Sequence, residues 1–499
     1  MGIPVNTGCR LQLSRPAACA TFVLLGWLCA QPSAAVYAQN SYNDYLLVHE
    51  NFAICTDGSQ PIAKRRSSCT VVIERGGLEK SEIAKIYLLL GQASQESGDD
   101  QVALQNFNAA IKSNPKYEQV WLGRAYFYAA KSDFSHALED YDQALKVNPN
   151  DAAVYDNRGI MLHTMGERDK AIADFSRAIA LDPQDRIAYS NRATLYLGSG
   201  KTNLAIADLS EVIRAEPTNG AAAYNRGTAY ERSGQIDKAM EDYRSAVRLQ
   251  PSFAPASAAL GRLLKDKDPN EAIVELSAAI RLDPRSPALR SRAILYLALA
   301  RFDDALHDFD RVIANDGSDS LAFLDRGVAQ EKLGNLEGAI RDYSHSIELA
   351  PMAPAYVNRG NGYVHMRQME QALADFNAAL ALEPANLAAL MGRAQASYAR
   401  KSMSESLVDY SRVIELDPKN VTAYFRRGNV HFDLREYAAA LNDYSDSLKL
   451  DPNQPVVLYN RSLAAARMGR LKDAANDRRR ALALDASVAG GEDVSSRGK

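Results

Sequence analysis

The chain has 499 residues, enough for several domains or for one long array of repeats. Its 58 Lys and Arg residues nearly balance 61 Asp and Glu residues, which gives a net charge of -3 at pH 7. No strong field of one sign therefore favours nucleic acid or an anionic membrane surface as a partner.

Residues 1–38 are typical of a secretory signal peptide. Arg10 and Arg15 precede an apolar run over residues 17–30, and residues 36–38 form a cleavage motif with small outer residues. We expect cleavage after Ala38 and a periplasmic or secreted protein. The apolar run is shorter than the ~20 residues of a membrane span, so no stable span is expected. An uncleaved membrane anchor is the alternative.

Residues 39–83 contain Cys55 and Cys69, the two cysteines that would remain after removal of the leader. Two cysteines in an oxidising compartment favour a disulfide bond. This bond would close a loop of about 15 residues, which the chain-entropy account values at roughly 3 kcal/mol. Two buried free thiols are the alternative.

From residue 84 onward the sequence repeats with a period close to 34 residues. In the unit that starts at Ala152, Tyr155 is fourth, Gly159 eighth, Ala171 twentieth and Phe175 twenty-fourth. This pattern resembles the tetratricopeptide repeat, a helix-turn-helix unit of 34 residues. Counted in this way, twelve units start near residues 84, 118, 152, 186, 220, 254, 286, 320, 353, 387, 421 and 455.

The resemblance implies an all-α fold, a right-handed superhelical solenoid of about twelve helix pairs. Small residues at positions eight and twenty would let the two helices of a unit approach closely. The array would cover residues 84–488, with a disordered tail at 489–499. Residues 39–83 resemble the cysteine-containing lead-in of exported bacterial proteins of this family, and we expect a degenerate helical pair there.

An arginine at position seven recurs in ten units, and the same ten units carry aspartate at position twenty-three. The two exceptions change at both positions together, to Leu90 with Asn106 and to Leu260 with Glu275. We therefore expect arginine and aspartate to pair, within one unit or between neighbours. Such pairs include Arg158 with Asp174, Arg192 with Asp208, and Arg226 with Asp242. A ladder of arginines for an anionic ligand is the alternative. The irregular unit from residue 254 is the predicted bend of the array.

No motif in the sequence predicts catalysis. The segment LYLGSGKT resembles a phosphate-binding loop, but Leu195 stands where that motif needs its first glycine. The seven histidines form no pair with metal-ligand spacing, and the residues outside the array are too few for a catalytic domain. We expect a protein that is not an enzyme, without catalytic, cofactor-binding or metal-binding residues.

Members of this family bind partners in a concave groove lined by the first helix of each unit. The resemblance implies that positions two, five, nine and twelve face this groove; packing between repeats is the alternative role for these side chains. The candidate contact residues are Tyr126, Tyr224, Met391, Tyr398, Phe425, Asn429, Phe432 and Tyr459. The prediction is an exported scaffold that binds a protein or peptide in the bacterial envelope. An accessory protein for polysaccharide binding or export is the alternative.

Overall fold

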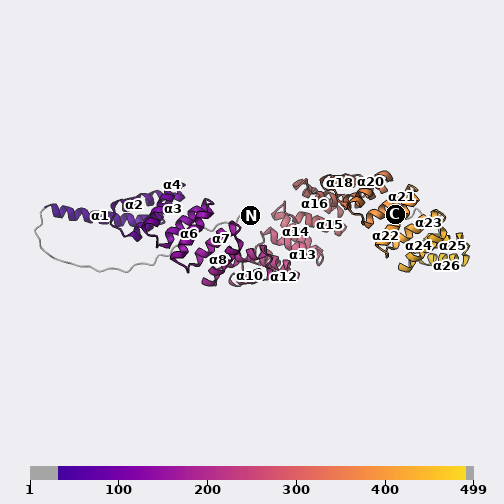
Figure 1. The fold of residues 1–499 in the computed structure, drawn as a ribbon, viewed down its shortest axis with the longest axis horizontal. Helices are drawn as coiled ribbons and strands as arrows, with labels where there is room; N and C mark the ends of the chain where they lie inside the picture. Colours follow the sequence, from indigo (N-terminus) through magenta and orange to yellow (C-terminus); the bar gives the residue numbers. More distant parts are fainter. Residues whose placement is uncertain (1–31, 491–499) are drawn as a thin grey trace. The chain divides into compact units, whose positions relative to one another are not determined.

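The computed structural model describes residues 32–490, and the side chains of residues 44–488. Within this range the chain folds into twenty-six α-helices and one 3-10 helix, with no strand (Figure 1). The predicted all-α solenoid of helix pairs is confirmed. The chain divides into two compact units, residues 1–195 and 196–499, and the division falls inside helix α9.

From α1 to α8 and from α11 to α26, consecutive helices pack as pairs, and within each compact unit these pairs pack on the next pair along the chain. We call the first helix of a pair helix A and the second helix B. The first unit contains α1 (Pro32–Thr56), α2 (Ile62–Arg75), α3 (Lys80–Glu96), α4 (Asp100–Ser113), α5 (Glu118–Ala130), α6 (Phe134–Val147), α7 (Ala152–Thr164), α8 (Arg168–Leu181) and most of α9 (Arg186–Gly198). The second unit contains α10 (Thr202–Ala215), α11 (Gly220–Arg232), α12 (Ile236–Leu249), α13 (Ala254–Leu264), α14 (Pro269–Leu282), α15 (Ala288–Ala298), α16 (Phe302–Asn315), α17 (Ser320–Lys332), α18 (Leu336–Leu349), α19 (Ala353–His365), α20 (Met369–Leu382), α21 (Leu387–Ala399), α22 (Met403–Leu416), α23 (Val421–Asp433), α24 (Tyr437–Leu450), α25 (Pro455–Arg467), α26 (Leu471–Leu484) and the 3-10 helix η1 (Ala486–Gly490).

The ends of the array differ slightly from the predicted boundaries. Helix α3 begins at Lys80, ahead of residue 84, because Glu79 and Glu82 form a capping box at its start. At the other end η1 reaches residue 490, and Val488 is buried against the last helix pair. The charged and apolar parts of the predicted leader and residues 491–499 lie outside the described residues, while the predicted cleavage point falls within α1.

The segment predicted as a degenerate pair, residues 39–83, contains most of α1, all of α2 and the start of α3, and α1 packs against α2. Cys55 and Cys69 are buried where these helices meet, and their sulfur atoms lie 1.98 Å apart, at the distance of a disulfide bond. Val72 and Ile86 are fully buried in the same cluster. This cluster joins the cysteine-containing pair to α3, the first helix of the regular array.

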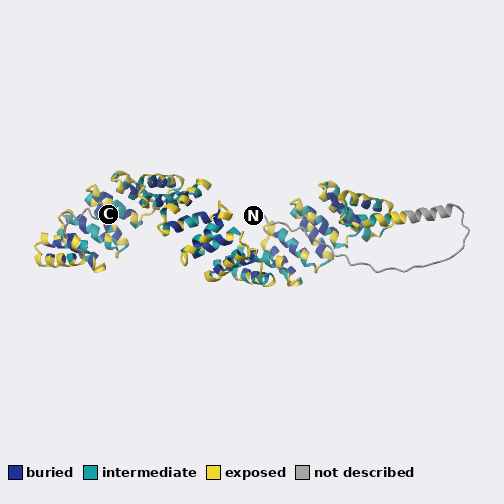
Figure 2. Cartoon of the chain, turned by 180° about the vertical axis from the view of Figure 1, so that it is seen from behind, coloured by how far each residue is buried: buried dark blue, intermediate teal, exposed yellow. Residues whose placement is uncertain are grey.

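The close packing inside a unit depends on the small residue at position eight. A Cβ atom on Gly327 would lie 2.6 Å from Cε1 of Tyr343, the fully buried ring at position twenty-four. Likewise, a Cβ atom on Gly159 would lie 2.8 Å from Cε1 of Phe175. Helix A can therefore rest directly on the aromatic ring of helix B, and the buried residues line the inside of each helix pair (Figure 2).

The turn between helices A and B has one residue with positive φ in nearly every unit. Six glycines at position fifteen have this conformation, with φ between 72° and 83°: Gly98, Gly166, Gly200, Gly234, Gly334 and Gly469. In five other units a side-chain-bearing residue takes the same place, with φ between 56° and 62°: Ser132, Ala300, Arg367, Lys401 and Arg435. The shared conformation shows that the turn geometry is set by the packed helices, and glycine only makes it less costly.

The recurring arginine and aspartate form a clasp inside one unit, the first of the two predicted arrangements. In nine of the ten units, Nε and one terminal nitrogen of the arginine donate to both carboxylate oxygens of the aspartate sixteen residues later, at 2.6–2.9 Å. Arg158–Asp174 and Arg226–Asp242 are among them. The tenth pair is Arg192 with Asp208. Arg192 belongs to the compact part of the chain that ends at residue 195, and the buried Asp208 belongs to the compact part that begins at residue 196.

The remaining terminal nitrogen of each arginine ties the unit to the preceding one. It donates to a side-chain oxygen on the previous helix B in all ten units, at 2.5–3.2 Å. Arg359, for example, reaches Ser344 at 2.9 Å, and its guanidinium lies over the rings of Tyr356 and Tyr363. The arginine thus joins three helices, and hydrogen bonding to Asp375 raises the pKa of Arg359.

Candidate functional site

We call the side chains at positions two, five, nine and twelve of the helices A, with their immediate neighbours, the A-face. Polar contacts link neighbouring helices A along this face. Asn157 donates to the hydroxyl of Tyr126 at 3.2 Å, and the hydroxyl of Tyr398 donates to the carboxylate of Asp433. The A-face is therefore organised by contacts between units as well as by the helices themselves.

The predicted contact residues differ widely in exposure. Tyr126 is 46% exposed, the most open of the eight. Met391, Tyr398, Phe425 and Phe432 are half-buried in α21 and α23, where each shows part of its surface to solvent. These four side chains form a partly open apolar area on the A-face of α21 and α23, beside the carboxylate of Asp433 that accepts from Tyr398.

Three of the predicted contact residues serve mainly in packing. Asn429 is 7% exposed and accepts hydrogen bonds from the Tyr444 hydroxyl at 2.8 Å and from Asn460 at 2.9 Å. Tyr459 is buried, and Tyr224 is half-buried with its ring 5.0 Å from that of Phe253. For Asn429 and Tyr459 the structure therefore corrects the expectation of an open contact residue, because side chains of neighbouring helices cover them.

A charged cluster occupies the A-face between α15 and α17. The guanidinium of Arg290 lies 3.5 Å from the carboxylate of Asp319 and 3.6 Å from that of Asp325. Burial raises the pKa of Asp325, and Arg290 partly opposes this shift. This cluster was not predicted from the sequence, although Arg290 stands at position five, where most units have an apolar residue.

A buried carboxylate stands at position five of the unit from residue 152. Asp156 is 8% exposed, and its Oδ1 has no hydrogen-bond partner. Burial, with a smaller contribution from Asp185, raises its pKa to about 7. Asp185 uses its own carboxylate to cap α9, accepting from the backbone nitrogens of Ile187 and Ala188 at 3.0 Å. A raised pKa by itself does not make Asp156 a catalytic acid.

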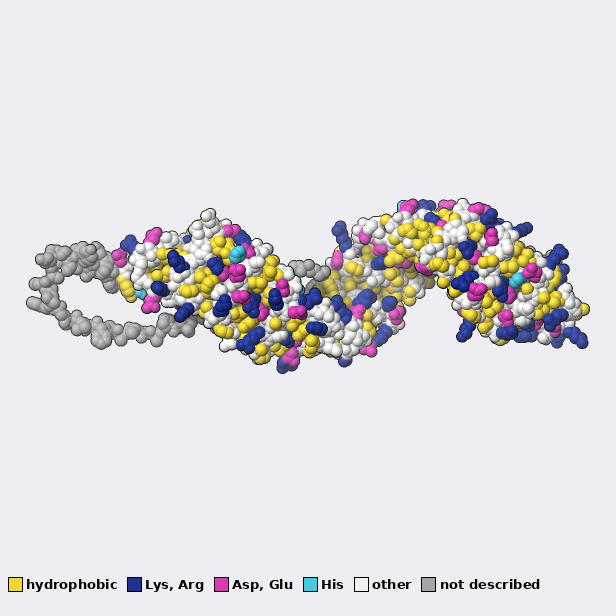
Figure 3. Space-filling model, viewed as in Figure 1, with side chains coloured by type: hydrophobic (Ala, Val, Ile, Leu, Met, Phe, Trp, Pro, Cys, Tyr) yellow, Lys and Arg dark blue, Asp and Glu magenta, His cyan; other side chains and the backbone are white. Residues whose placement is uncertain are grey.

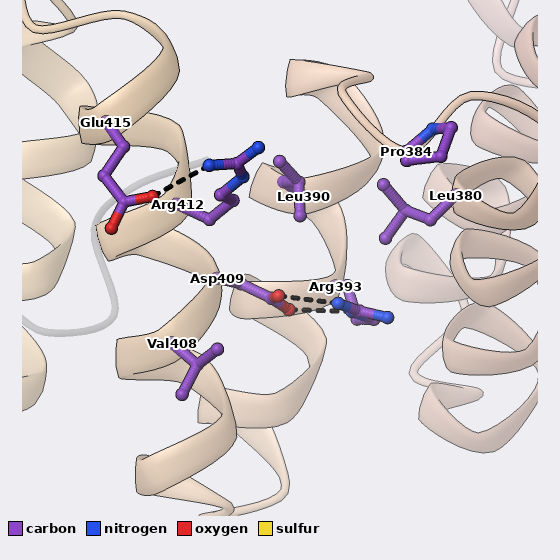
Figure 4. A pocket seen from close by; sticks show the side chains of 8 residues that line it. All are labelled: Leu380, Pro384, Leu390, Arg393, Val408, Asp409, Arg412 and Glu415. Carbon is purple, nitrogen blue, oxygen red and sulfur yellow. Dashed lines mark hydrogen bonds and ion pairs between the residues drawn. The ribbon is translucent and has the colours of Figure 1, made fainter.

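An open depression of about 370 Å³ lies on the side of the helices B, between α20, α21 and α22 (Figure 4). Its floor includes Leu380, Leu390 and Val408. The charged residues around it are paired with each other: Arg393 with Asp409 at 2.7 Å and Arg412 with Glu415 at 2.9 Å. With its charges already paired, this depression offers no group prepared for proton transfer or nucleophilic attack.

In the part of the chain that the structure describes, no group of three or more His, Cys, Asp or Glu side chains could hold a metal ion. Among the helices of residues 32–490, none is both long enough and apolar enough to cross a membrane. Charged side chains of both signs are interspersed over the surface seen in Figure 3. The clasps disfavour the alternative of an arginine ladder for an anionic ligand, because nine of its ten guanidinium groups are already paired with aspartate.

Helix pairs that repeat along the chain and pack on their neighbours are the defining feature of an α-solenoid repeat protein. Here the same arginine contacts to three helices recur from pair to pair. The chain belongs to the tetratricopeptide repeat family. Models of this repeat match residues 84–117, 124–190, 190–254, 290–354, 353–386, 394–434 and 421–454.

Known proteins share this repeat at modest similarity. Human tetratricopeptide repeat protein 6 is 37% identical over 119 residues, which are 23% of this chain. The chain spans only 22% of the length of that curated relative. The solved C-terminal part of a TPR repeat-containing protein from Cytophaga hutchinsonii is 21% identical, with a TM-score of 0.42, and the match covers 47% of this chain and 98% of the solved part. MamA from Desulfovibrio magneticus RS-1 is 22% identical, over 34% of this chain and 97% of its own, with a TM-score of 0.32.

Proposed function

We propose that the protein is an exported scaffold that binds a partner protein on the A-face of α21 and α23. The observation that carries this proposal is the set of half-buried side chains Met391, Tyr398, Phe425 and Phe432 on two neighbouring helices A. Large apolar and aromatic side chains that keep part of their surface open are the usual anchors of a protein interface. Membership of a family of binding scaffolds supports the same role.

The mechanism is recognition by a surface that exists before the partner arrives. The hydroxyl of Tyr398 donates a hydrogen bond to Asp433 on the next helix A. The ring of Phe432 packs edge-on against that of Tyr437, with 5.4 Å between the ring centroids. Because these contacts already fix the side chains, little rotamer freedom is lost when a partner covers them. An extended peptide or an amphipathic helix would place its own apolar side chains along this face.

Capture of partners from a periplasmic extract tests the proposal. The variant Tyr398→Ala with Phe432→Ala should lose most of the proteins that the wild type retains. The control variant, Val408→Ala with Leu471→Ala, removes side chains that are 67% and 70% exposed on helices B, and should retain them. Circular dichroism must show that both variants remain folded. Equal capture by the two variants would contradict the chosen face.

The same variants distinguish protein binding from the polysaccharide alternative. If the protein is a polysaccharide accessory, the wild type should be retained on immobilised envelope polysaccharide and should capture no protein from the extract. The Tyr398→Ala, Phe432→Ala variant should then be retained less on the polysaccharide. The proposed export has its own test. The mature protein should be found in the periplasmic fraction with Gln39 as its first residue, whereas an intact leader in the cytoplasm would refute export.

A further inference from the structure

The joint between the unit from residue 220 and the unit from residue 254 lacks the arginine clasp. Leu260 occupies the position of the arginine and is 1% exposed. Glu275 takes the place of the aspartate, and its Oε2 is buried without a hydrogen-bond partner. A depression of about 510 Å³ lies beside Leu260 and Glu275, between α12 and the helices of the next unit.

Three exposed ion pairs cross this joint instead. Arg262 on α13 lies 2.6 Å from Glu231 on α11, and Arg244 on α12 donates to both oxygens of Glu271 on α14. Lys267, in the turn after α13, pairs with Asp237 at the start of α12. All six side chains retain between 22% and 86% of their exposure to solvent.

The sequence of the preceding helix B matches this change. At the clasped joints, position twenty-five of the preceding unit is Asn, Asp or Ser, which accepts the third arginine bond. At this joint the same position is Arg244, which donates toward the next unit. The direction of the guanidinium contact is thus reversed, and it has moved from a half-buried position to the surface.

The two kinds of joint differ in how they respond to salt. Exposed ion pairs are weakened as the screening length falls from ~10 Å at 0.1 M to ~3 Å at 1 M. The contact that a clasp sends across its joint is the third arginine bond, and at the joint between α18 and α19 its acceptor is the uncharged, half-buried hydroxyl of Ser344, which screening by ions affects little. Salt should therefore loosen the unclasped joint before the joint between α18 and α19.

We propose that the joint between α11–α12 and α13–α14 is a salt-sensitive hinge, which lies within the compact part of the chain from residue 196 to residue 499. At low ionic strength the three surface ion pairs hold the two helix pairs together. At high ionic strength these pairs weaken, and no buried clasp replaces them. The inference is independent of the proposed A-face function, because it rests on different helices and needs no partner.

Hydrogen exchange of the full chain, read by mass spectrometry, tests the hinge. The amides of α13 are compared with those of α19, which packs on α18 across a joint clasped by Arg359. Between about 20 mM and about 500 mM NaCl, exchange in α13 should accelerate roughly fivefold or more, since screening removes most of three exposed pairs. Exchange in α19 should change less than about twofold, since its clasp is half-buried. Equal acceleration in the two helices would overturn the proposal.

A triple variant identifies the ion pairs as the cause. Neutralising the three cations in Arg244→Gln, Arg262→Gln and Lys267→Gln should give fast exchange in α13 at low salt and remove its salt dependence. The matched control changes the net charge equally at exposed residues that form no ion pair in the described part of the chain: Arg281→Gln, Arg285→Gln and Lys332→Gln. This control should behave as the wild type does.

Neutralising the acceptors gives a second, independent variant, Glu231→Gln with Asp237→Asn and Glu271→Gln. It should lose the salt dependence of α13 in the same way, although it shifts the net charge in the opposite direction. A salt response of α13 that persists in both triple variants would overturn the proposal, because the response would then have another origin.

Discussion

Breaking one clasp should cost more than removing both of its partners. The pair Arg359–Asp375 is a clear case, because its two direct hydrogen bonds are 2.8 and 2.7 Å long and the aspartate side chain is only 6% exposed. Arg359→Leu leaves a buried carboxylate without its cation. Removing one partner of a buried pair typically costs 3–5 kcal/mol, and we expect about 2–4 kcal/mol because the guanidinium here is 19% exposed.

The double variant Arg359→Leu with Asp375→Asn should cost less than Arg359→Leu alone. The chain already contains this combination, since Leu90 and Asn106 occupy the same two positions in the unit from residue 84. With no buried charge left unpaired, the expected loss is about 1 kcal/mol, which arises mainly from the lost bond to Ser344.

Local hydrogen exchange in α19 and α20 is the appropriate assay, because long repeat arrays need not unfold in a single cooperative step. The free energies of local opening give a double-mutant cycle for the pair. The expected coupling energy is about 1–3 kcal/mol. If the double variant lowers the free energy of local opening by the sum of the two single effects, Arg359 and Asp375 act independently. That result would contradict the clasp as a stabilising pair.

Three further predictions concern other parts of the array. Gly327→Ala should lower the stability of its unit by about 1–3 kcal/mol in local exchange, because the added Cβ would lie 2.6 Å from the ring of Tyr343; no change would refute the packing argument. The pKa of Asp156 is raised to about 7, so the folded state binds its proton more tightly than the unfolded state, and stability should fall as the pH rises from 4 to 7. Asp156→Asn should flatten this part of the thermal-denaturation profile, and an unchanged slope would contradict it. Replacing Cys55 and Cys69 with serine should destabilise α1 and α2 by roughly 3 kcal/mol, and thiol labelling of the periplasmic protein without reductant should fail; ready labelling would show free thiols.

The repeat pattern predicted the helix pairs and the clasp, because both depend on residues that recur at fixed positions. Arg158 and Asp174 are sixteen residues apart and meet within one unit, which the joint change to Leu90 and Asn106 had already suggested. The same reasoning overlooked the acceptor at position twenty-five. The residue at this position is Asn, Asp or Ser in different units, so no single residue type recurs there. Arg244 at the unclasped joint was nevertheless a usable signal.

The exposure of the A-face was harder to predict, because it depends on the side chains that neighbouring units contribute. Asn429 and Phe432 are both on α23, yet Asn429 is buried by Tyr444 and Asn460 while Phe432 keeps part of its surface open. A rule based on position alone treats the two residues alike. The burial of a particular side chain follows from the size and reach of its neighbours, and these differ from one unit to the next.

This difference between recurring and variable positions bears on where a partner would bind. The clasp, the small residue at position eight and the ring at position twenty-four recur because every unit needs them to pack, as Gly327 on Tyr343 illustrates. Position five needs no such uniformity, and it holds Asp156, Arg290, Met391 and Phe425 in different units. A partner that distinguishes one stretch of the array from another must therefore contact positions of this second kind. Position five belongs to the A-face, which is why recognition is placed there and not at the clasps.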